Sequence, residues 1–305
     1  MRLAITCFLV PLLFAGILFS QSGVQAPHRV EVNVVQVPLL ITVTDGTGRL
    51  ITTLNKDSFR VYEGNRLQKI ESFSRDSNLP LSIALLIDQS SSAIDKLEFE
   101  RAAALDFFNN TVKRGKDRAM LIGFSSDAKM LADFTDDPEK FADGLKKLEA
   151  GGGTAVYDTL FLAAQQKLAQ EKGERRKLII LISDGDDTAS RYSLATALAT
   201  VQKNDVLIYA ISINRIADMK NDERERGDKA IRQMVDETGG RAYYPAKISE
   251  LAAEFKKIEA ELRSQYALAY SPTNPFDGTY RKLRVDMVDK KFKARTRAGY
   301  IASKN

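Results

Sequence analysis

The hydrophobic positions of the chain alternate regularly between two kinds of segment from residue 80 to residue 264. Continuous apolar runs, such as SIALLID at 82–88, are separated by longer stretches with helical spacing. Continuous runs are typical of parallel strands buried on both faces, and their alternation with helices indicates a doubly wound, mostly parallel α/β sheet. The predicted strands are 82–88, 118–124, 128–134, 177–183, 206–213 and 241–244. The predicted helices are 94–113, 138–148, 155–171, 190–203, 228–238 and 248–263.

The segments on either side of this unit, 27–79 and 265–305, have the sequence pattern of β-strands instead. They contain runs rich in Val, Ile, Thr and aromatic residues with partial alternation. Hairpin turns are predicted at DGTG (45–48), at Glu63-Gly64-Asn65 and at Asp277-Gly278. Because each flank alone offers too few strands to be stable, we expect the two flanks to pair into one discontinuous, β-sandwich-like domain.

The first 26 residues have the pattern of a secretory signal peptide. Arg2 precedes an apolar run from Leu3 to Phe19, and small residues suited to cleavage follow. Cleavage between residues 23 and 27 would give a secreted or periplasmic protein. The run is about as long as the ~20 residues that span a bilayer, so an uncleaved membrane anchor is the alternative. Contact with a membrane is expected only in that case.

Composition removes several classes of function. Of the 305 residues, 44% are hydrophobic and 28% are charged, as in folded globular proteins. The single cysteine, Cys7, lies in the signal segment, and the single histidine is His28. Disulfides, thiolate–metal sites, histidine-based triads and multi-histidine zinc sites are therefore excluded from the mature protein. The net charge is only +5, with basic and acidic residues interspersed, so we expect no nucleic-acid partner.

Hydroxyl and carboxylate side chains follow the predicted buried strands. Asp88 ends one strand and begins an Asp-x-Ser-x-Ser motif with Ser90 and Ser92, whereas Asp184 ends another strand. Thr154 comes after three glycines at the start of a predicted helix. Open α/β sheets bind ligands at the carboxyl ends of their strands, and hard oxygen donors of this kind suit Mg²⁺ or Mn²⁺. The alternative is that these residues only cap helices, since Ser and Asp are common N-cap residues.

Other polar features carry weaker signals. The glycines at 151–153 are not followed by Lys-Ser/Thr, which argues against a phosphate-binding P-loop. We interpret Asp158, Asp186 and Asp187 as solvated acids or as acids at helix N-termini. The charge run at 222–229 is interpreted as a surface loop.

Residues 81–263 resemble a von Willebrand factor A domain. Asp88, Ser90, Ser92, Thr154 and Asp184 match the metal-ion-dependent adhesion site of that family position by position. The whole chain resembles secreted bacterial proteins of the von Willebrand factor A-related group, a type noted in acidobacteria. The resemblance implies that Ser90, Ser92 and Thr154 contact a Mg²⁺, Mn²⁺ or Ca²⁺ ion directly, while Asp88 and Asp184 often act through water. It also implies that one coordination position is left for an acidic group of the ligand.

Three hypotheses of function remain at this point. The leading one is an exported, non-enzymatic binding protein that holds a divalent cation and captures an acidic side chain of a protein partner. The second is a scaffold whose A domain is passive and whose β segments make the contacts. The third is a metal-assisted hydrolase, against which stands the lack of a histidine or cysteine to act as general base. The domains predicted with these hypotheses are a signal peptide at 1–26, β-rich segments at 27–79 and 265–305, and the A domain at 80–264.

Overall fold

The chain is organised around a six-stranded, mostly parallel sheet. The computed structural model describes residues 36–75, 79–90, 97–216, 221–274 and 276–302. The strand order is β10-β9-β8-β5-β6-β7, and only β7 at one edge runs antiparallel to its neighbour. The strands are β5 (Leu81–Asp88), β6 (Arg118–Phe124), β7 (Ala128–Thr135), β8 (Arg176–Ser183), β9 (Val206–Ser212) and β10 (Ala242–Tyr243). The α/β fold predicted from the sequence is confirmed.

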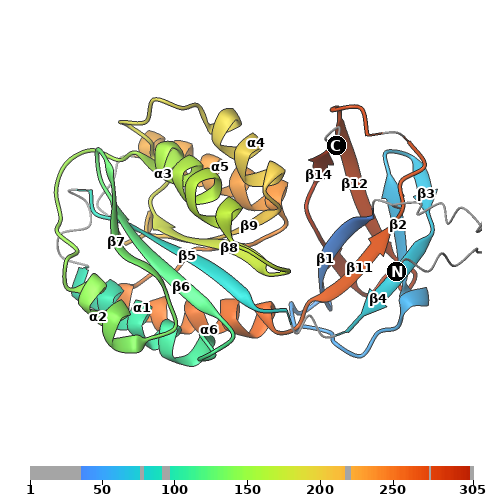
Figure 1. Cartoon of the computed structure of the whole chain (residues 1–305), viewed down its shortest axis with the longest axis horizontal. Helices are drawn as coiled ribbons and strands as arrows, with labels where there is room; N and C mark the ends of the chain where they lie inside the picture. Colours follow the sequence, from blue (N-terminus) through green and yellow to red (C-terminus); the bar gives the residue numbers. More distant parts are fainter. Residues whose placement is uncertain (1–35, 76–78, 91–96, 217–220, 275, 303–305) are drawn as a thin grey trace, which may run out of the picture. The chain divides into compact units, whose positions relative to one another are not determined.

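Helices cover both faces of this sheet (Figure 1). They are α1 (Leu97–Thr111), α2 (Pro138–Leu145), α3 (Val156–Leu162), α4 (Leu194–Lys203), α5 (Asn221–Thr238) and α6 (Leu251–Leu262). Helices α1, α2 and α6 pack on one face, and α3, α4 and α5 pack on the other. All eight residues of β5 are buried, with Ile83 and Leu85 in one core and Ala84 and Leu86 in the other. This two-sided burial explains why the strand is a continuous apolar run.

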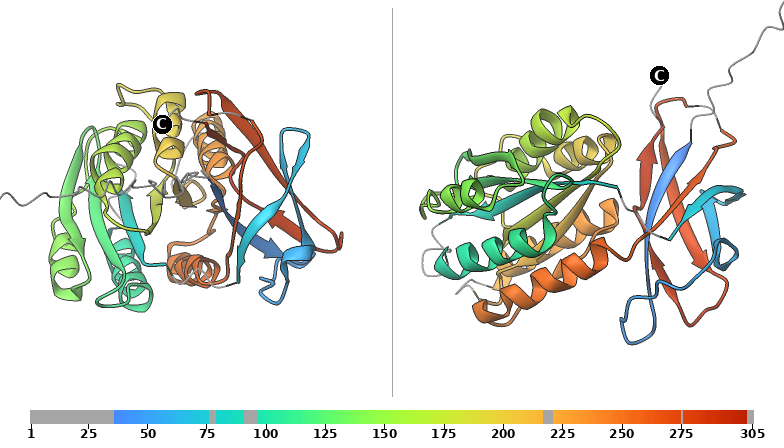
Figure 2. Two further views of the ribbon diagram at one scale, coloured as in Figure 1. Left: turned by 45° about the vertical axis from the view of Figure 1, so that its right-hand side comes forward. Right: turned by 60° about the horizontal axis from the view of Figure 1, so that its bottom comes forward.

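The β segments before and after the α/β region share two antiparallel sheets, whose strand orders are β13-β1-β11-β4 and β14-β12-β2-β3. The strands are β1 (Val37–Thr44), β2 (Phe59–Glu63), β3 (Arg66–Gln68), β4 (Ile70–Ser74), β11 (Tyr266–Tyr270), β12 (Tyr280–Met287), β13 (Lys293–Arg295) and β14 (Gly299–Ile301). Strand β1 pairs with β11, and β2 pairs with β12, so that early and late strands lie side by side (Figure 2). Their apolar faces meet in a third core. The outer limits of the predicted domains stay predictions.

One of the three predicted hairpins is wrong, and another is much shorter than predicted. The turn at Gly64-Asn65 does join the paired strands β2 and β3. After the DGTG turn, however, the chain makes a single bridge between Thr44 and Leu50, because β1 pairs with β11 and β13 instead. The Asp277-Gly278 turn does not form a hairpin of β11 with β12, since these strands belong to different sheets. Long-range pairing has overridden the local turn signals in both places.

Two helix assignments also differ from the sequence prediction. The charge run at 222–229 is not a loop but lies in α5, which begins at Asn221. Helix α4 begins later than predicted, at Leu194, because the Ser193 hydroxyl accepts the amide N–H of Thr196 at 3.2 Å and caps the helix. The predicted helix at 155–171 continues past α3 as a short π-helix and then a 3₁₀ turn.

The segment after the DGTG turn is fixed by a side chain of the other flank. The hydroxyl of Tyr266, a fully buried residue in β11, donates to the carbonyl of Ile51 at 2.8 Å and accepts the amide N–H of Leu54 at 3.0 Å. These two hydrogen bonds replace the ladder that the predicted hairpin would have supplied.

We expect Tyr266→Phe to lower the free energy of unfolding by about 1–3 kcal/mol, because it leaves two backbone groups of this segment without their partner. Chemical denaturation of the full chain measures the change. Tyr280→Phe is the matched control, since Tyr280 is 51% exposed and its removal should change stability by no more than about 0.5 kcal/mol. Equal losses in the two variants would contradict the assigned role of Tyr266.

Candidate metal centre

Asp88 and Asp184 lie at the same edge of the central sheet. Asp88 is the last residue of β5, and Asp184 directly follows β8, its parallel neighbour. The carboxyl ends of the two strands therefore meet, and the exposed fractions of Asp88 and Asp184 are 0% and 4%. Between them, the Ser183 hydroxyl donates to Asp88 Oδ2 at 2.6 Å. Two carboxylates are thus buried at neighbouring strand ends, as the sequence predicted.

The second oxygen of Asp88 shapes the loop that follows. The amide N–H of Ser90 donates to Asp88 Oδ1 at 2.8 Å, and Ser90 is 5% exposed. The amide N–H of Asp186 makes the equivalent contact with Asp184 Oδ1 at 3.0 Å. Each aspartate therefore organises its own turn through a bond to the amide two residues later. Ser92, the remaining predicted ligand, lies outside the described residues.

Thr154 is brought to the same place by hydrogen bonds between loops. The amide N–H of Gly151 donates to the carbonyl of Gln89 at 2.6 Å, next to Asp88 in the chain. The Thr154 amide N–H donates to Thr188 Oγ1 at 3.0 Å, and the Thr154 carbonyl accepts the Thr188 amide at 2.9 Å. Thr154 is 6% exposed, and its hydroxyl makes no hydrogen bond within the part of the chain that the structure describes. Four of the five predicted ligands therefore converge where the β5, α3 and β8 loops meet.

The electrostatics of this site favour a bound cation. Burial and, after it, the negative charge of Asp184 together raise the pKa of Asp88 to about 6, against the lowering effect of hydrogen bonds from Ser183 and Ser90. In the described ranges, no group of three or more His, Cys, Asp and Glu side chains could hold a metal. A cation here would therefore depend on hydroxyl ligands as well as the two carboxylates. This oxygen-only donor set fits a hard divalent ion such as Mg²⁺ or Mn²⁺.

Several supporting residues were not identified from the sequence. Ser183 is one, although a buried serine at the end of an apolar strand is a signal that could have found it. The carboxylate of Asp187, by contrast, accepts the Tyr157 amide at 3.1 Å and the Ser190 hydroxyl at 2.6 Å. Asp187 thus lies at the N-terminus of α3, as one of the two interpretations had it. Asp158 does not act as a solvated acid, because it accepts two loop amides, those of Arg191 and Tyr192, at 2.9 Å each.

Helix α5 holds the Asp184 loop from behind. The Asn214 side-chain amide donates to the Asp184 carbonyl at 2.8 Å and to Asp228 Oδ1 of α5 at 2.7 Å. At Gly227 of α5, a Cβ atom would lie 2.1 Å from the Asp184 carbonyl oxygen, so any other residue would force the helix away. The Arg226 guanidinium pairs with Asp186 at 3.1 Å. The position of Asp184 therefore depends on helix α5, whose first seven residues were not predicted to be helical.

Comparison with known proteins gives one family. The family model of the von Willebrand factor type A domain matches residues 82–258, which is more than half of the chain. A search of curated proteins returns no significant match. In the described ranges, no helix is long and apolar enough to cross a membrane.

Solved structures with related folds include three of interest. Proximal thread matrix protein 1 of the mussel byssus, with a zinc-occupied MIDAS motif, is 17% identical with a TM-score of 0.50. The match covers 66% of this chain and 49% of the mussel chain, so this chain spans about half of that protein. BatB of Bacteroides thetaiotaomicron is 16% identical over 60% of this chain and 97% of its own, with a TM-score of 0.48. The vWF domain of the type V pili tip protein Mfa5 of Porphyromonas gingivalis is 15% identical over 60% and 95%, with a TM-score of 0.48. At these identities the likeness concerns the fold alone.

We expect Mg²⁺ or Mn²⁺ to stabilise the folded protein, by about 2.7 kcal/mol when the free ion is a hundredfold above its dissociation constant. Thermal melting at constant ionic strength measures the shift. Asp184→Ala should abolish it, because the variant removes one of the two buried carboxylates. Asp186→Asn is the control, since it changes a neighbouring carboxylate that pairs with Arg226 instead. An equal metal response in wild type and Asp184→Ala would show that the cluster only caps helices.

A dependence on pH follows from the raised pKa of Asp88. Without metal, the contribution of Asp88 to stability is greatest below its unfolded pKa of about 3.9 and is lost as the pH rises through about 6. A cation must displace this proton, so we expect metal affinity to fall about tenfold per pH unit below pH 6 and to level off above it. Calorimetric titration between pH 5 and 8 tests this. A metal affinity that stays constant across that range would contradict it.

Proposed function

Because this chain belongs to the von Willebrand factor type A domain family, we propose that it is an exported, non-enzymatic binding protein whose A domain captures an acidic group of a protein partner through a divalent cation. Asp88, Ser90, Ser92, Thr154 and Asp184 would hold the ion. Mg²⁺ is the first choice of metal, with Mn²⁺ and Ca²⁺ as the others. The protein would act outside the cytoplasm, in line with the signal-like pattern of residues 1–26.

One observation carries this proposal, namely the hydroxyl at Thr154 beside two buried carboxylates. Hydroxyl ligands do not neutralise a cation, so an ion held mainly by them keeps enough positive charge to accept a carboxylate from another molecule. The aspartates counter part of its charge and favour its binding. The zinc-occupied MIDAS motif of the mussel protein, and the place of Mfa5 at a pilus tip, are consistent with adhesion by such a domain.

A hydrolase is the less favoured alternative. Metal-assisted hydrolysis needs a group that can take a proton from water at neutral pH. Asp88 has its pKa raised to about 6, but both of its oxygens accept hydrogen bonds from neighbouring groups. Those bonds hold the carboxylate in place as a structural acceptor. We therefore assign Asp88 to metal binding and no residue to catalysis.

A peptide selection tests the proposal. A displayed library of random peptides is bound to the immobilised full-length protein in Mn²⁺ and released with a chelator. We expect the released peptides to share an Asp or Glu whose replacement by Asn or Gln abolishes binding. Asp184→Ala protein should retain none of them, whereas Asp186→Asn protein should retain all.

Two outcomes would contradict the proposal. Peptides that resist the chelator and lack a common acid would favour the passive scaffold. Metal-dependent turnover of a phosphoester substrate, lost in Asp184→Ala, would favour the hydrolase.

A further inference from the structure

A second polar site lies away from the candidate metal centre, where α5 and β10 meet β1 and β13. It is a pocket of about 320 Å³, which we name the basic pocket. The charged and aromatic side chains that line it are Arg232, Asp236, Arg241, Tyr244, Lys293 and Arg295. Thr42 and Thr44 of β1 line it as well. None of these residues takes part in the function proposed above.

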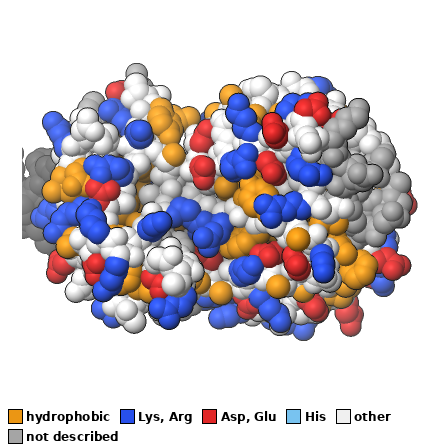
Figure 3. Space-filling view, turned by 180° about the vertical axis from the view of Figure 1, so that it is seen from behind, with side chains coloured by type: hydrophobic (Ala, Val, Ile, Leu, Met, Phe, Trp, Pro, Cys, Tyr) orange, Lys and Arg blue, Asp and Glu red, His pale blue; other side chains and the backbone are white. Residues whose placement is uncertain are grey.

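The basic pocket carries an excess of positive charge. Four cationic side chains line it against one carboxylate, that of Asp236. On the face drawn in Figure 3, Lys and Arg side chains are interspersed with Asp and Glu. The chain as a whole has 45 basic and 40 acidic residues, so four to one in a single cavity is a local departure from the average. Such a concentration attracts anions.

The four cations differ in their present partners. Arg295 and Arg241 share one buried carboxylate, Glu261, with Arg241 Nη1 at 3.9 Å from it. The side chains of Arg232 and Lys293 make no hydrogen bond or ion pair with any residue that the structure describes. Even when Glu261 is counted, the positive charge of the pocket is only half compensated. Arg232 and Lys293 are the groups that can serve a ligand without giving up a structural contact.

Two buried donors in the basic pocket also lack an acceptor. Arg295 Nε and the Tyr244 hydroxyl are both shielded from solvent and have no hydrogen-bond partner in the described ranges. A buried donor left without an acceptor lowers the stability of the folded protein. A ligand with several acceptor oxygens would engage the two free cations, Arg232 and Lys293.

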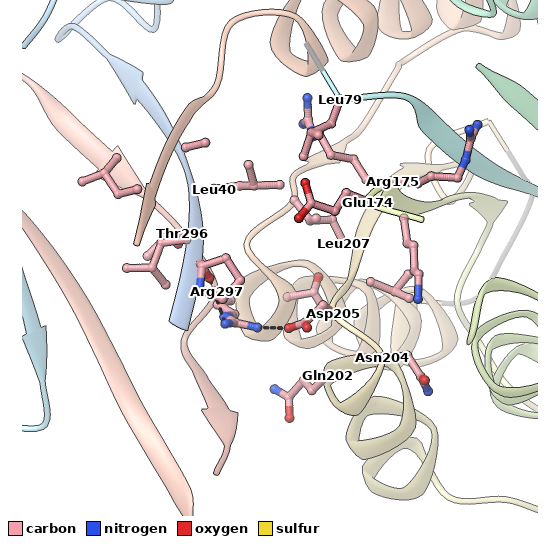
Figure 4. Close-up of a pocket in the computed structure, with 18 of the residues that line it drawn as sticks. Leu40, Leu79, Glu174, Arg175, Gln202, Asn204, Asp205, Leu207, Thr296 and Arg297 are labelled. Atoms are coloured by element: carbon pink, nitrogen blue, oxygen red, sulfur yellow. Dashed lines mark hydrogen bonds and ion pairs between the residues drawn. The ribbon is translucent and has the colours of Figure 1, made fainter. Parts of the chain in front are cut away.

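The larger pocket of the molecule lacks these properties. It measures about 450 Å³ and has four cationic side chains against three acidic ones. Arg297 is occupied there, by Asp205 and by the Pro38 carbonyl at 2.9 Å, and Leu40, Leu79 and Leu207 line its interior (Figure 4). Arg175 likewise donates to Ser82 and to two carbonyls. Two of the cations of this pocket, Arg175 and Arg297, are therefore already bound to groups of the protein.

We propose that the basic pocket binds the phosphate group of a small molecule. Arginine forks match the oxygens of a phosphate, whose charge of nearly −2 would offset the unpaired cations. A pocket of about 320 Å³ is near the lower limit for small-molecule sites, which suits a sugar phosphate better than a polymer. The hydroxyl of Thr44 would supply a hydrogen bond to such a ligand.

Calorimetric titration of the full chain with inorganic phosphate and with glucose 6-phosphate tests the proposal. A chelator is present throughout and chloride keeps the ionic strength constant, so neither the metal centre nor general screening contributes. We expect both probes to bind, and the double variant Arg232→Gln/Lys293→Gln to bind them about tenfold more weakly or worse. That variant should fold normally, because it removes no contact within the described structure.

The matched control is Lys229→Gln/Lys290→Gln, which removes two exposed charges from the same segments outside the pocket. This control and Asp184→Ala should bind phosphate as the wild type does. Tighter binding of the sugar phosphate would identify an organic phosphate as the ligand, and equal binding would identify the free anion. Absence of heat above the chloride blank, or equal weakening in the two double variants, would overturn the proposal.

Discussion

The mutual repulsion of two buried carboxylates is the constraint around which the candidate metal centre is built. Strands β5 and β8 are neighbours because their apolar runs are buried on both faces, and this pairing brings Asp88 and Asp184 together at one sheet edge. Neither residue can turn to water, since both are almost fully buried. Burial and the negative charge of Asp184 therefore raise the pKa of Asp88. A cation bound between the two loops would offset the negative charge of both carboxylates, whereas a proton on Asp88 neutralises only one of them.

The surrounding framework keeps the carboxylates from moving apart. Gly185 and Gly227 allow the backbone of the Asp184 loop to touch helix α5 directly, because neither carries a Cβ atom. Asn214 adds a hydrogen bond to the Asp184 carbonyl beside that contact. Together these contacts hold the loop in place before any ligand arrives. Such preorganisation is what a metal site on loops needs in order to bind tightly.

Much of the fold could be predicted because each central strand is buried on both faces and is therefore a continuous apolar run in the sequence. The apolar runs at 82–88 and 177–183 are compatible with few structures other than buried strands. Asp88 and Asp184, at the ends of these runs, mark the edge of the sheet where the site lies. The hairpins expected after β1 and after β11 failed for the opposite reason, since β1 pairs with β11 and β12 pairs with β2, and the strands of each pair lie more than 200 residues apart in the chain. Local turn signals could not reveal them. Helix α5 was partly missed because its first turns are nearly all charged, and only Gly227 and Ala230 hint at a buried face.

Three buried carboxylates outside the candidate metal centre have partners within the chain. Glu261 is compensated by Arg295 and by the Tyr209 hydroxyl, and Asp117 by Arg263 at 2.6 Å. Glu63 has no arginine, yet the hydroxyls of Tyr270 and Tyr300 and the amide of Asn274 satisfy both of its oxygens. Neutral donors are thus enough for a carboxylate that stands alone. Asp88 also has neutral donors, from Ser90 and Ser183, but burial and the charge of a second buried carboxylate, Asp184, raise its pKa. Neutral donors do not offset the negative charge of Asp184. This uncompensated charge is the physical reason to expect a cation at the end of β5.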